Sequence, residues 1–219
     1  MLVKEVMSTP VVTVTPETPM TDALKILRER RIRRLPVVSR GRLLGIVTEL
    51  DIVRASPSPV TSLSVAELAY LVPKITVKEI MTKDPLTIDP NAPIERAAVI
   101  MRDRKIGGLP VVEGDAVVGI ITESDIFDAF LSLLGATRPT ERLTIEYSGD
   151  VQELMRITEC LAQCEIHPLN MAVYRTPAGQ ARVILRLEAK QAERAIQLLR
   201  QAGIVVHTPA TEDQVALLA

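Results

Sequence analysis

The stretch from Gly45 to Asp51 reads GIVTELD, and 74 positions later the stretch from Gly119 to Asp125 reads GIITESD. Both follow the pattern Gly-x-x-Thr-x-x-Asp. When the chain is aligned with itself at this offset, residues 3–55 match residues 77–129 without a gap, and 23 of the 53 positions are identical. The chain therefore contains an internal duplication, and we expect both copies to fold alike.

Each copy carries the same series of structural signals. A short apolar strand ending in Thr-x-x-Pro comes first, and an amphipathic helix opened by Pro19 or Pro93 follows it. A hairpin is expected next, with strands at Leu35 to Val38 and Leu43 to Val47 in the first copy and at Leu109 to Val112 and Val117 to Ile121 in the second. The motif then leads into a final helix. This β-α-β-β-α unit of about 50 residues is too small to bury its apolar face alone, so we expect the two copies to pack together.

Turn-forming residues divide the rest of the chain. Ser56-Pro57-Ser58-Pro59 follows the first copy, and the run from Gly135 to Pro139 follows the second. Beyond it, strand and helix patterns alternate in the β-α-β-β-α-β order of a ferredoxin-like domain. The predicted fold class is α+β, with a first repeat at 1–56, a linker with a short helix at 57–76, a second repeat at 77–134, a linker at 135–142, a C-terminal domain at 143–210 and a tail at 211–219.

Composition limits the functional classes. The chain has 219 residues, 47% of them hydrophobic, and a formal net charge of −1, which is typical of a folded globular protein. It shows neither a membrane-length apolar run, nor a signal peptide, nor a basic stripe interleaved with aromatic residues. We therefore expect a cytoplasmic protein without membrane or nucleic-acid partners. Because no catalytic motif is recognisable, we expect neither enzymatic activity nor catalytic residues.

The two cysteines, Cys160 and Cys164, are four residues apart, and His167 follows them. This spacing could place three metal ligands near one helical face. Structural zinc sites usually need four ligands, however, and buried apolar thiols are the favoured interpretation. We predict neither a metal site nor a required cofactor.

The repeated motif has two interpretations. Thr48 with Asp51, and Thr122 with Asp125, fit a capping box at a helix start. The same arrangement also suits a ligand: a helix N-terminus offers N–H groups to phosphate, and a carboxylate can accept bonds from the vicinal hydroxyls of a ribose. The preceding glycine would let backbone approach that ligand closely. The second interpretation predicts a nucleoside phosphate site.

Residues 3–129 resemble a tandem pair of CBS domains, the Bateman module, because the strand-Pro-helix pattern, the Leu-Pro-Val-Val strands and Gly-x-x-Thr-x-x-Asp recur in order. Such pairs bind AMP, ADP, ATP or, less favoured here, S-adenosylmethionine in clefts between the repeats. The resemblance implies ribose contacts from the motif aspartates, phosphate contacts from its threonines, and an adenine framed by Thr13, Thr87 and the backbone around Leu35-Pro36 and Leu109-Pro110. The implied ligand-binding residues are Thr13, Leu35, Pro36, Thr48, Asp51, Thr87, Leu109, Pro110, Thr122 and Asp125, and comparison of the copies adds Arg33, Arg34, Gly107 and Gly108.

That comparison reveals a difference in charge. Residues 3–55 contain 10 basic and 6 acidic residues, whereas residues 77–129 contain 6 basic and 10 acidic residues. Arg33 and Arg34 align with Gly107 and Gly108, so we expect guanidinium groups in one cleft and open backbone in the other. Because arginine suits phosphate oxygens, our hypothesis is that the first-repeat cleft favours the more highly phosphorylated nucleotide.

The C-terminal segment resembles an ACT domain, a small regulatory fold, although Ser148-Gly149-Asp150-Val151 replaces its usual Asp-x-x-Gly loop. An amino-acid site and a dimerisation sheet are both open for it. The whole chain resembles acetoin-utilisation proteins of the AcuB type. We therefore expect a homodimeric, adenosine-nucleotide-sensing regulator of an unknown protein target, and the resemblance implies a role in acetoin or acetyl-CoA metabolism. The alternatives are a ligand-free structural or interaction module and an amino-acid sensor.

Overall fold

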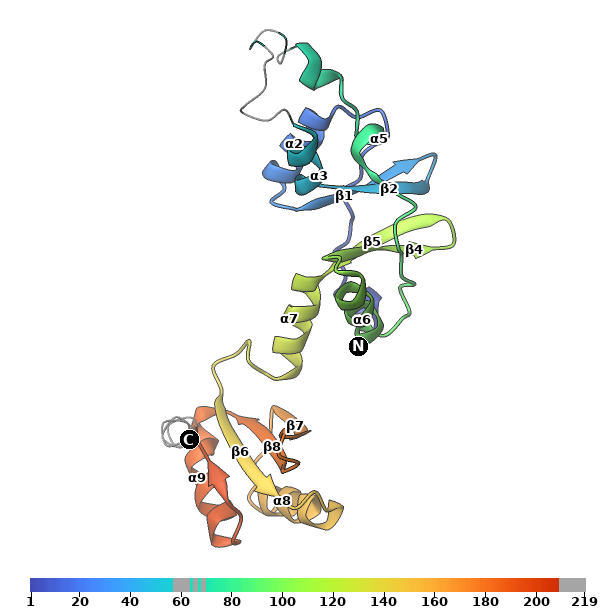
Figure 1. Cartoon of the computed structure of the whole chain (residues 1–219). Helices are drawn as coiled ribbons and strands as arrows, with labels where there is room; N and C mark the ends of the chain where they lie inside the picture. The colour runs from blue at the N-terminus through green and yellow to red at the C-terminus, as the bar shows by residue number, and fades with distance from the viewer. Residues whose placement is uncertain (57–63, 65–66, 68–69, 209–219) are drawn as a thin grey trace. The chain divides into compact units, whose positions relative to one another are not determined.

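The structure is a computed structural model that describes residues 1–56, 64, 67 and 70–208 (Figure 1). The chain divides into two compact units, Met1–Phe127 and Asp128–Ala219. The tail at 211–219 lies outside the described residues, and so does most of the helix predicted within the 57–76 linker, of which Glu67, Tyr70 and Leu71 are described and are helical. A short 3-10 helix, η1 (Val72–Lys74), follows them. Within the described part of the chain, every helix is too short or too polar to cross a membrane.

The two repeats form matching elements, and helix, hairpin and helix recur in the predicted order. The first repeat contains α1 (Val3–Val6), α2 (Met20–Glu29), β1 (Arg34–Ser39), β2 (Arg42–Thr48) and α3 (Glu49–Ala55). The second contains α5 (Val77–Ile80), β3 (Thr82–Lys83), α6 (Ile94–Arg104), β4 (Gly108–Glu113), β5 (Ala116–Thr122) and α7 (Glu123–Leu133).

The strand predicted at the start of each repeat was wrong in extent, because only a single parallel bridge forms there. Val14 donates to the Pro36 carbonyl and accepts from the Val38 N–H. The next bonds on either side would need N–H groups from Pro16 and Pro36, and proline has none. The equivalent bridge, Ile88 to Val111, is interrupted in the same way.

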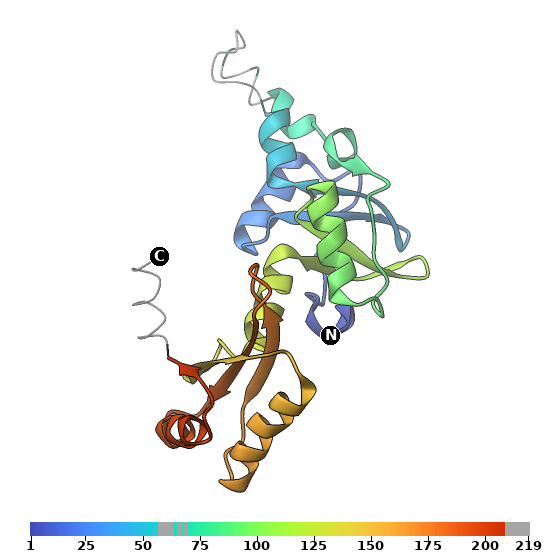
Figure 2. The same ribbon diagram turned by 60° about the horizontal axis from the view of Figure 1, so that its bottom comes forward.

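The two hairpins share one sheet with the order β1-β2-β5-β4, and β3 adds to β2 (Figure 2). The order is symmetric, because each hairpin presents its second strand to the centre. The two hairpins also have the same irregularity, between Val37 and Val38 and between Val111 and Val112. The duplication therefore gives the first unit a pseudo-twofold arrangement.

Each repeat lends its N-terminal segment to the other. Thr82 and Lys83 pair with Ile46 and Gly45 of strand β2, and Val77 is fully buried in the core of the first repeat. In the reciprocal exchange, the residues between helices α1 and α2 reach strand β5, where Ser8 bridges to Ile120. This exchange explains in physical terms why a repeat of about 50 residues does not suffice alone.

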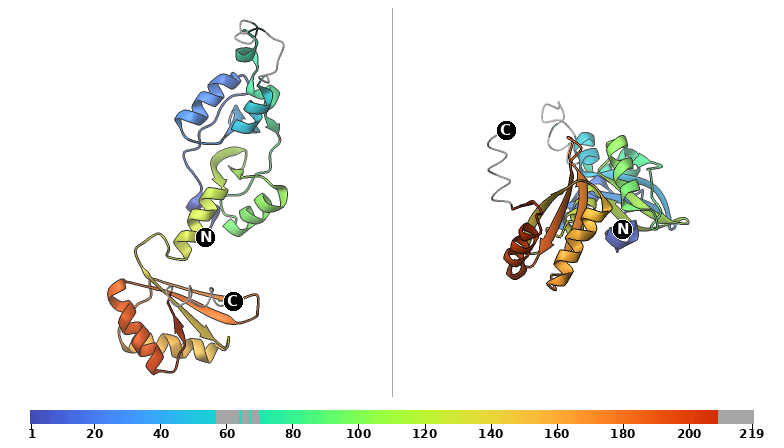
Figure 3. Two further views of the ribbon diagram at one scale, coloured as in Figure 1. Left: turned by 60° about the vertical axis from the view of Figure 1, so that its left-hand side comes forward. Right: turned by 90° about the horizontal axis from the view of Figure 1, so that it is seen from below.

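The second unit has the predicted β-α-β-β-α-β order. Its elements are β6 (Glu141–Tyr147), α8 (Val151–Gln163), β7 (Asn170–Arg175), β8 (Ala181–Leu187), α9 (Ala189–Gln201) and β9 (Val206–His207). The four strands are antiparallel in the order β7-β8-β6-β9, and α8 and α9 lie beside each other against the sheet (Figure 3). Cys160 and Cys164 are half-buried against the core of this unit.

Candidate functional site

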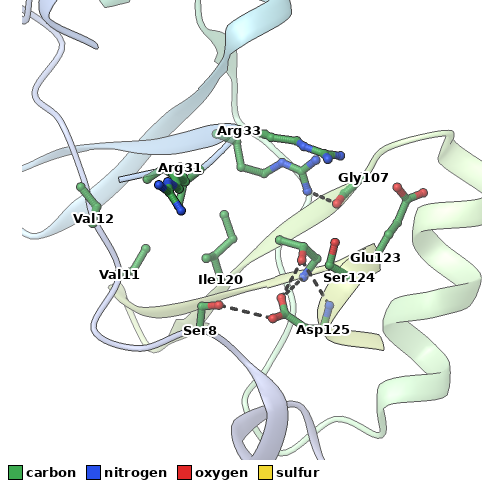
Figure 4. Close-up of a pocket in the computed structure, with 13 residues that line it drawn as sticks. Ser8, Val11, Val12, Arg31, Arg33, Gly107, Ile120, Glu123, Ser124 and Asp125 are labelled. Carbon is green, nitrogen blue, oxygen red and sulfur yellow. Dashed lines mark hydrogen bonds between the residues drawn. The ribbon is translucent and has the colours of Figure 1, made fainter. Parts of the chain in front are cut away.

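Two clefts lie between the repeats, and every residue that lines the smaller one has its counterpart, 74 positions away, in the lining of the larger one. The Asp51 cleft, about 760 Å³, is lined by Thr48 and Asp51 of the first motif and by Thr82, Pro85 and Leu86 of the exchanged segment, with Lys105 to Gly108 completing it. The Asp125 cleft, about 330 Å³, is lined by Thr122 and Asp125, by Ser8, Val11 and Val12, and by Arg31 to Arg34 (Figure 4). The segment exchange therefore builds each cleft from both repeats.

The capping-box interpretation of the motif is confirmed. In the first repeat, Oδ2 of Asp51 accepts hydrogen bonds from the Thr48 N–H at 2.8 Å and the Thr48 hydroxyl at 2.6 Å. The Thr48 hydroxyl accepts in turn from the Asp51 N–H at 3.3 Å. Thr122 and Asp125 repeat the arrangement, with 2.7 Å for both bonds to Oδ2. These bonds fix the orientation of each carboxylate.

One oxygen of each carboxylate remains outside the capping box. Oδ1 of Asp125 faces Ser8, whose hydroxyl donates to it at 3.4 Å (Figure 4). Over residues 1–56, 64, 67 and 70–208, no hydrogen bond reaches Oδ1 of Asp51. Capping and ligand binding are therefore compatible, because the cap uses Oδ2 and leaves Oδ1 directed to other donors.

The motif glycines do not serve the purpose that we predicted for them. Gly45 and Gly119 are buried, and neither lines the cleft of its own motif. A side chain at Gly45 would place Cβ 2.5 Å from the Met81 sulfur, and one at Gly119 would place it 2.5 Å from the Met7 sulfur. Both methionines belong to exchanged segments. The glycines therefore make room for the exchange rather than for a ligand.

The prediction that only one cleft carries the guanidinium groups of Arg33 and Arg34 is wrong. Both arginines line both clefts. Arg34 donates to the Gly107 carbonyl across the repeat boundary, and its pKa is lowered mainly by burial, although the nearby Glu123 carboxylate opposes that shift. The reason is the pseudo-twofold arrangement, which brings residues 33–34 and 107–108 together at the junction of the two clefts.

Comparison with known proteins agrees with this architecture. Residues 3–58 and 77–132 match the CBS domain. The chain belongs to the CBS domain family.

The relatives of this CBS pair include both free-standing and embedded pairs. A CBS domain-containing protein of Dictyostelium discoideum is 35% identical over 140 residues, which are 63% of this chain and 97% of the relative. The inosine-5'-monophosphate dehydrogenase of Korarchaeum cryptofilum is 36% identical over 118 residues, 53% of this chain, but these are only 22% of that enzyme. The similarity to the enzyme therefore covers a small part of it.

Solved structures show the same pair. The CBS domain pair of protein MJ0100, in complex with 5'-methylthioadenosine and S-adenosyl-L-methionine, has a TM-score of 0.51 and 34% identity over 63% of this chain and 98% of that chain. A putative acetoin utilization protein, AcuB, from Vibrio cholerae has a TM-score of 0.52 and 30% identity over 63% and 95%. CBSX2 in complex with AMP has a TM-score of 0.52 and 28% identity over 60% and 97%.

The structure brings together most of the residues that the sequence nominated. Besides both motif pairs and both arginines, Gly107 lines both clefts, and Gly108 and Pro110 line the Asp51 cleft. Pro36 lines neither cleft, and the side chains of Leu35 and Leu109 are fully buried in the core.

The two threonines of the first segments lie elsewhere. Thr13 is exposed and lines neither cleft. Thr87 is exposed in a separate pocket of about 420 Å³ beside Arg42 and Asp115. With only a bridge in place of the predicted strand, these threonines do not reach the clefts.

Sequence reasoning missed the residues that the exchange contributes. Ser8, Val11 and Val12 face the motif of the second repeat, and Thr82, Pro85 and Leu86 face that of the first. The offset of 74 positions marks these sets as equivalent, but nothing in it indicates that each would cross to the other repeat.

Proposed function

We propose that the protein is a regulator that senses adenosine nucleotides of the AMP, ADP and ATP class in its two clefts. The observation that carries this proposal is the facing arrangement in each cleft. An oriented motif carboxylate lines each cleft together with basic side chains from the residues at or just before a strand start, and apolar side chains line the same cleft.

The chemistry of the clefts suits such a ligand. Oδ1 of each aspartate can accept from ribose hydroxyls, while arginines and Lys105 suit phosphate oxygens. Val11 and Val12 in one cleft, and Pro85 and Leu86 in the other, provide aliphatic surface for a purine ring. Both volumes fall within the range of about 300–1,000 Å³ that is common for small-molecule sites.

The related structures support adenosine as the shared element, because they hold AMP, 5'-methylthioadenosine and S-adenosyl-L-methionine. For this chain we favour the phosphorylated compounds, since two arginines line both clefts. S-adenosylmethionine carries a positive sulfonium and no phosphate, so it would use those arginines less well. No further cofactor is part of the proposal.

Signalling requires that the nucleotide bind two states of the protein with different affinity. We propose a homodimer whose geometry changes with occupancy and an unidentified protein target, with a cytoplasmic location where such nucleotides are abundant. The second unit, with its β-α-β-β-α-β order, would act as an ACT-like relay or dimerisation domain. The similarity to the Vibrio cholerae protein supports a role in acetoin utilisation.

The test is calorimetric titration of AMP, ADP, ATP and S-adenosyl-L-methionine into the wild type, Asp51→Asn and Asp125→Asn. Asparagine can still accept one bond from the capping threonine, so the cap is largely preserved. Losing one charged acceptor should weaken the altered cleft by about 10- to 100-fold and leave the other cleft occupied. Asp103→Asn is the matched control, because Asp103 is exposed on α6, outside both clefts.

A ligand-free interaction module is the second candidate. Its support is the capping box itself, which gives Thr48 and Asp51 a structural role without any ligand. The absence of heat with every nucleotide in the wild type would favour this candidate. Heat on titrating amino acids instead would favour the ACT-like unit as the sensor.

A further inference from the structure

Arg34 lies where the two clefts meet. It is the first residue of strand β1 and is half-buried. Its guanidinium crosses to the second repeat and donates to the Gly107 carbonyl. Arg34 and Gly107 line both the Asp51 cleft and the Asp125 cleft, so the two proposed nucleotide sites share this guanidinium, as they share that of Arg33.

The second repeat is shaped to receive this side chain. A Cβ added at Gly107 would lie 2.6 Å from Nη2 of Arg34, and one added at Gly108 would collide with Nη1. Residues 107 and 108 are the repeat equivalents of 33 and 34, so arginine in one copy occupies space that glycine leaves open in the other. The difference between the copies therefore makes the Arg34 contact possible, because arginines at 107 and 108 would occupy the space of its guanidinium.

The charged groups that act on Arg34 are Arg33 and the carboxylates of the Asp125 cleft. Burial lowers its pKa, and Glu123 and Asp125 of the Asp125 cleft oppose that shift. A guanidinium that is partly withdrawn from water gains from a phosphate in either cleft. Its donors are limited, however, and one already serves Gly107. A phosphate in the second cleft would find fewer free N–H groups on the Arg34 guanidinium, and the phosphate in the first cleft would repel it.

We propose that Arg34 couples the two clefts, so that a nucleotide in one weakens binding in the other. This inference rests on the proposed nucleotide function. The coupling makes the protein respond over a wider range of nucleotide concentration than two independent sites would, because the second cleft fills only at higher concentration.

Arg33 provides the matched control. It lines both clefts as Arg34 does, but it is exposed, and over the described residues no hydrogen bond joins it to the second repeat. Arg33→Met should weaken ADP binding without removing the coupling, whereas Arg34→Met should weaken binding and also make the clefts independent.

The experiment is calorimetric titration with ADP of the full chain in three backgrounds: unaltered, Asp51→Asn and Asp125→Asn. The two single-cleft variants give the affinity of each site while the other, weakened by about 10- to 100-fold, stays largely empty at the concentrations that fill the intact cleft. We expect the second binding step of the unaltered chain to be about tenfold weaker than the matching single-cleft affinity. In the Arg34→Met series this ratio should fall to one, and in the Arg33→Met series it should persist.

Gly107→Ala supplies a second variant that keeps the charge, because its Cβ would push the guanidinium away from the junction. It should also reduce the ratio. A ratio that stays unchanged in Arg34→Met and Gly107→Ala, even with a lower melting temperature, would show that Arg34 only joins the repeats. Independent sites or tighter second binding in the unaltered chain would refute the coupling alone, whereas absence of ADP binding would refute the proposed function with it.

Discussion

Replacing Gly45 with alanine should destabilise the protein more than the same change at its repeat counterpart, Gly119. The two glycines occupy equivalent places in β2 and β5, and both are buried. Their neighbours differ. The three atoms nearest to a Cβ at Gly119 all belong to the flexible side chain of Met7. A Cβ at Gly45 would meet Met81 and also the backbone carbonyl of Thr82, at 2.8 Å.

The size of the difference follows from this carbonyl. Ordinary van der Waals contact begins at 3.4 Å, so the Thr82 carbonyl must retreat by about 0.6 Å, although β3 is held to β2 by the pairing of Thr82 with Ile46. Overpacking of this kind costs roughly 1–3 kcal/mol, and alanine recovers roughly 0.4–1 kcal/mol through the unfolded chain. We expect a net loss of about 1–2 kcal/mol for Gly45→Ala.

For Gly119→Ala, moving Met7 costs of order 0.5–1.5 kcal/mol, which the same unfolded-state effect largely offsets. The assay is urea unfolding of the full chain, monitored by circular dichroism. The dependence of the unfolding free energy on urea concentration should be the same in both variants and the wild type, which shows that the same two states are compared. Equal losses in the two variants, or a larger loss for Gly119→Ala, would refute the reasoning. Because Thr82 also lines the Asp51 cleft, Gly45→Ala should weaken nucleotide binding there.

Two further predictions concern hydrogen bonds at helix starts. Thr48→Val removes the hydroxyl that caps α3 and should cost about 1 kcal/mol in urea unfolding, whereas Thr48→Ser should stay near the wild type; equal loss in both would exclude the cap as the cause. At α8, hydrogen bonds from the hydroxyl and N–H of Ser148 lower the pKa of Glu153, so its ionised form stabilises the folded state at neutral pH, and this contribution is lost as the pH falls through the lowered pKa. Glu153→Gln should therefore lower the melting temperature at pH 7 and match the wild type well below about pH 4, and a difference that persists in acid would contradict this origin.

Local features of the fold were predictable because their residues are close in the chain. Thr48 and Asp51 are three positions apart, so the capping box follows from the geometry of one helical turn. The Leu-Pro-Val-Val hairpins follow from strand alternation and their turn residues. The prediction of a first strand in each repeat failed because pairing depends on which N–H groups meet across the sheet. In the first repeat, Pro16 and Pro36 have no N–H to donate.

The sequence by itself determined that there are two equivalent repeats, where the two longer helices of each begin, and that each carries a carboxylate at a helix start, because these are properties of repetition and short spacing. It gave no sign of the short helices α1 and α5. The tertiary structure alone decided how the clefts are built. It placed Ser8 beside Asp125 and Arg34 against Gly107, contacts between residues far apart in the chain. Such contacts depend on the exchange of N-terminal segments and on the pseudo-twofold packing, and both arise only when two incomplete cores bury their apolar faces together.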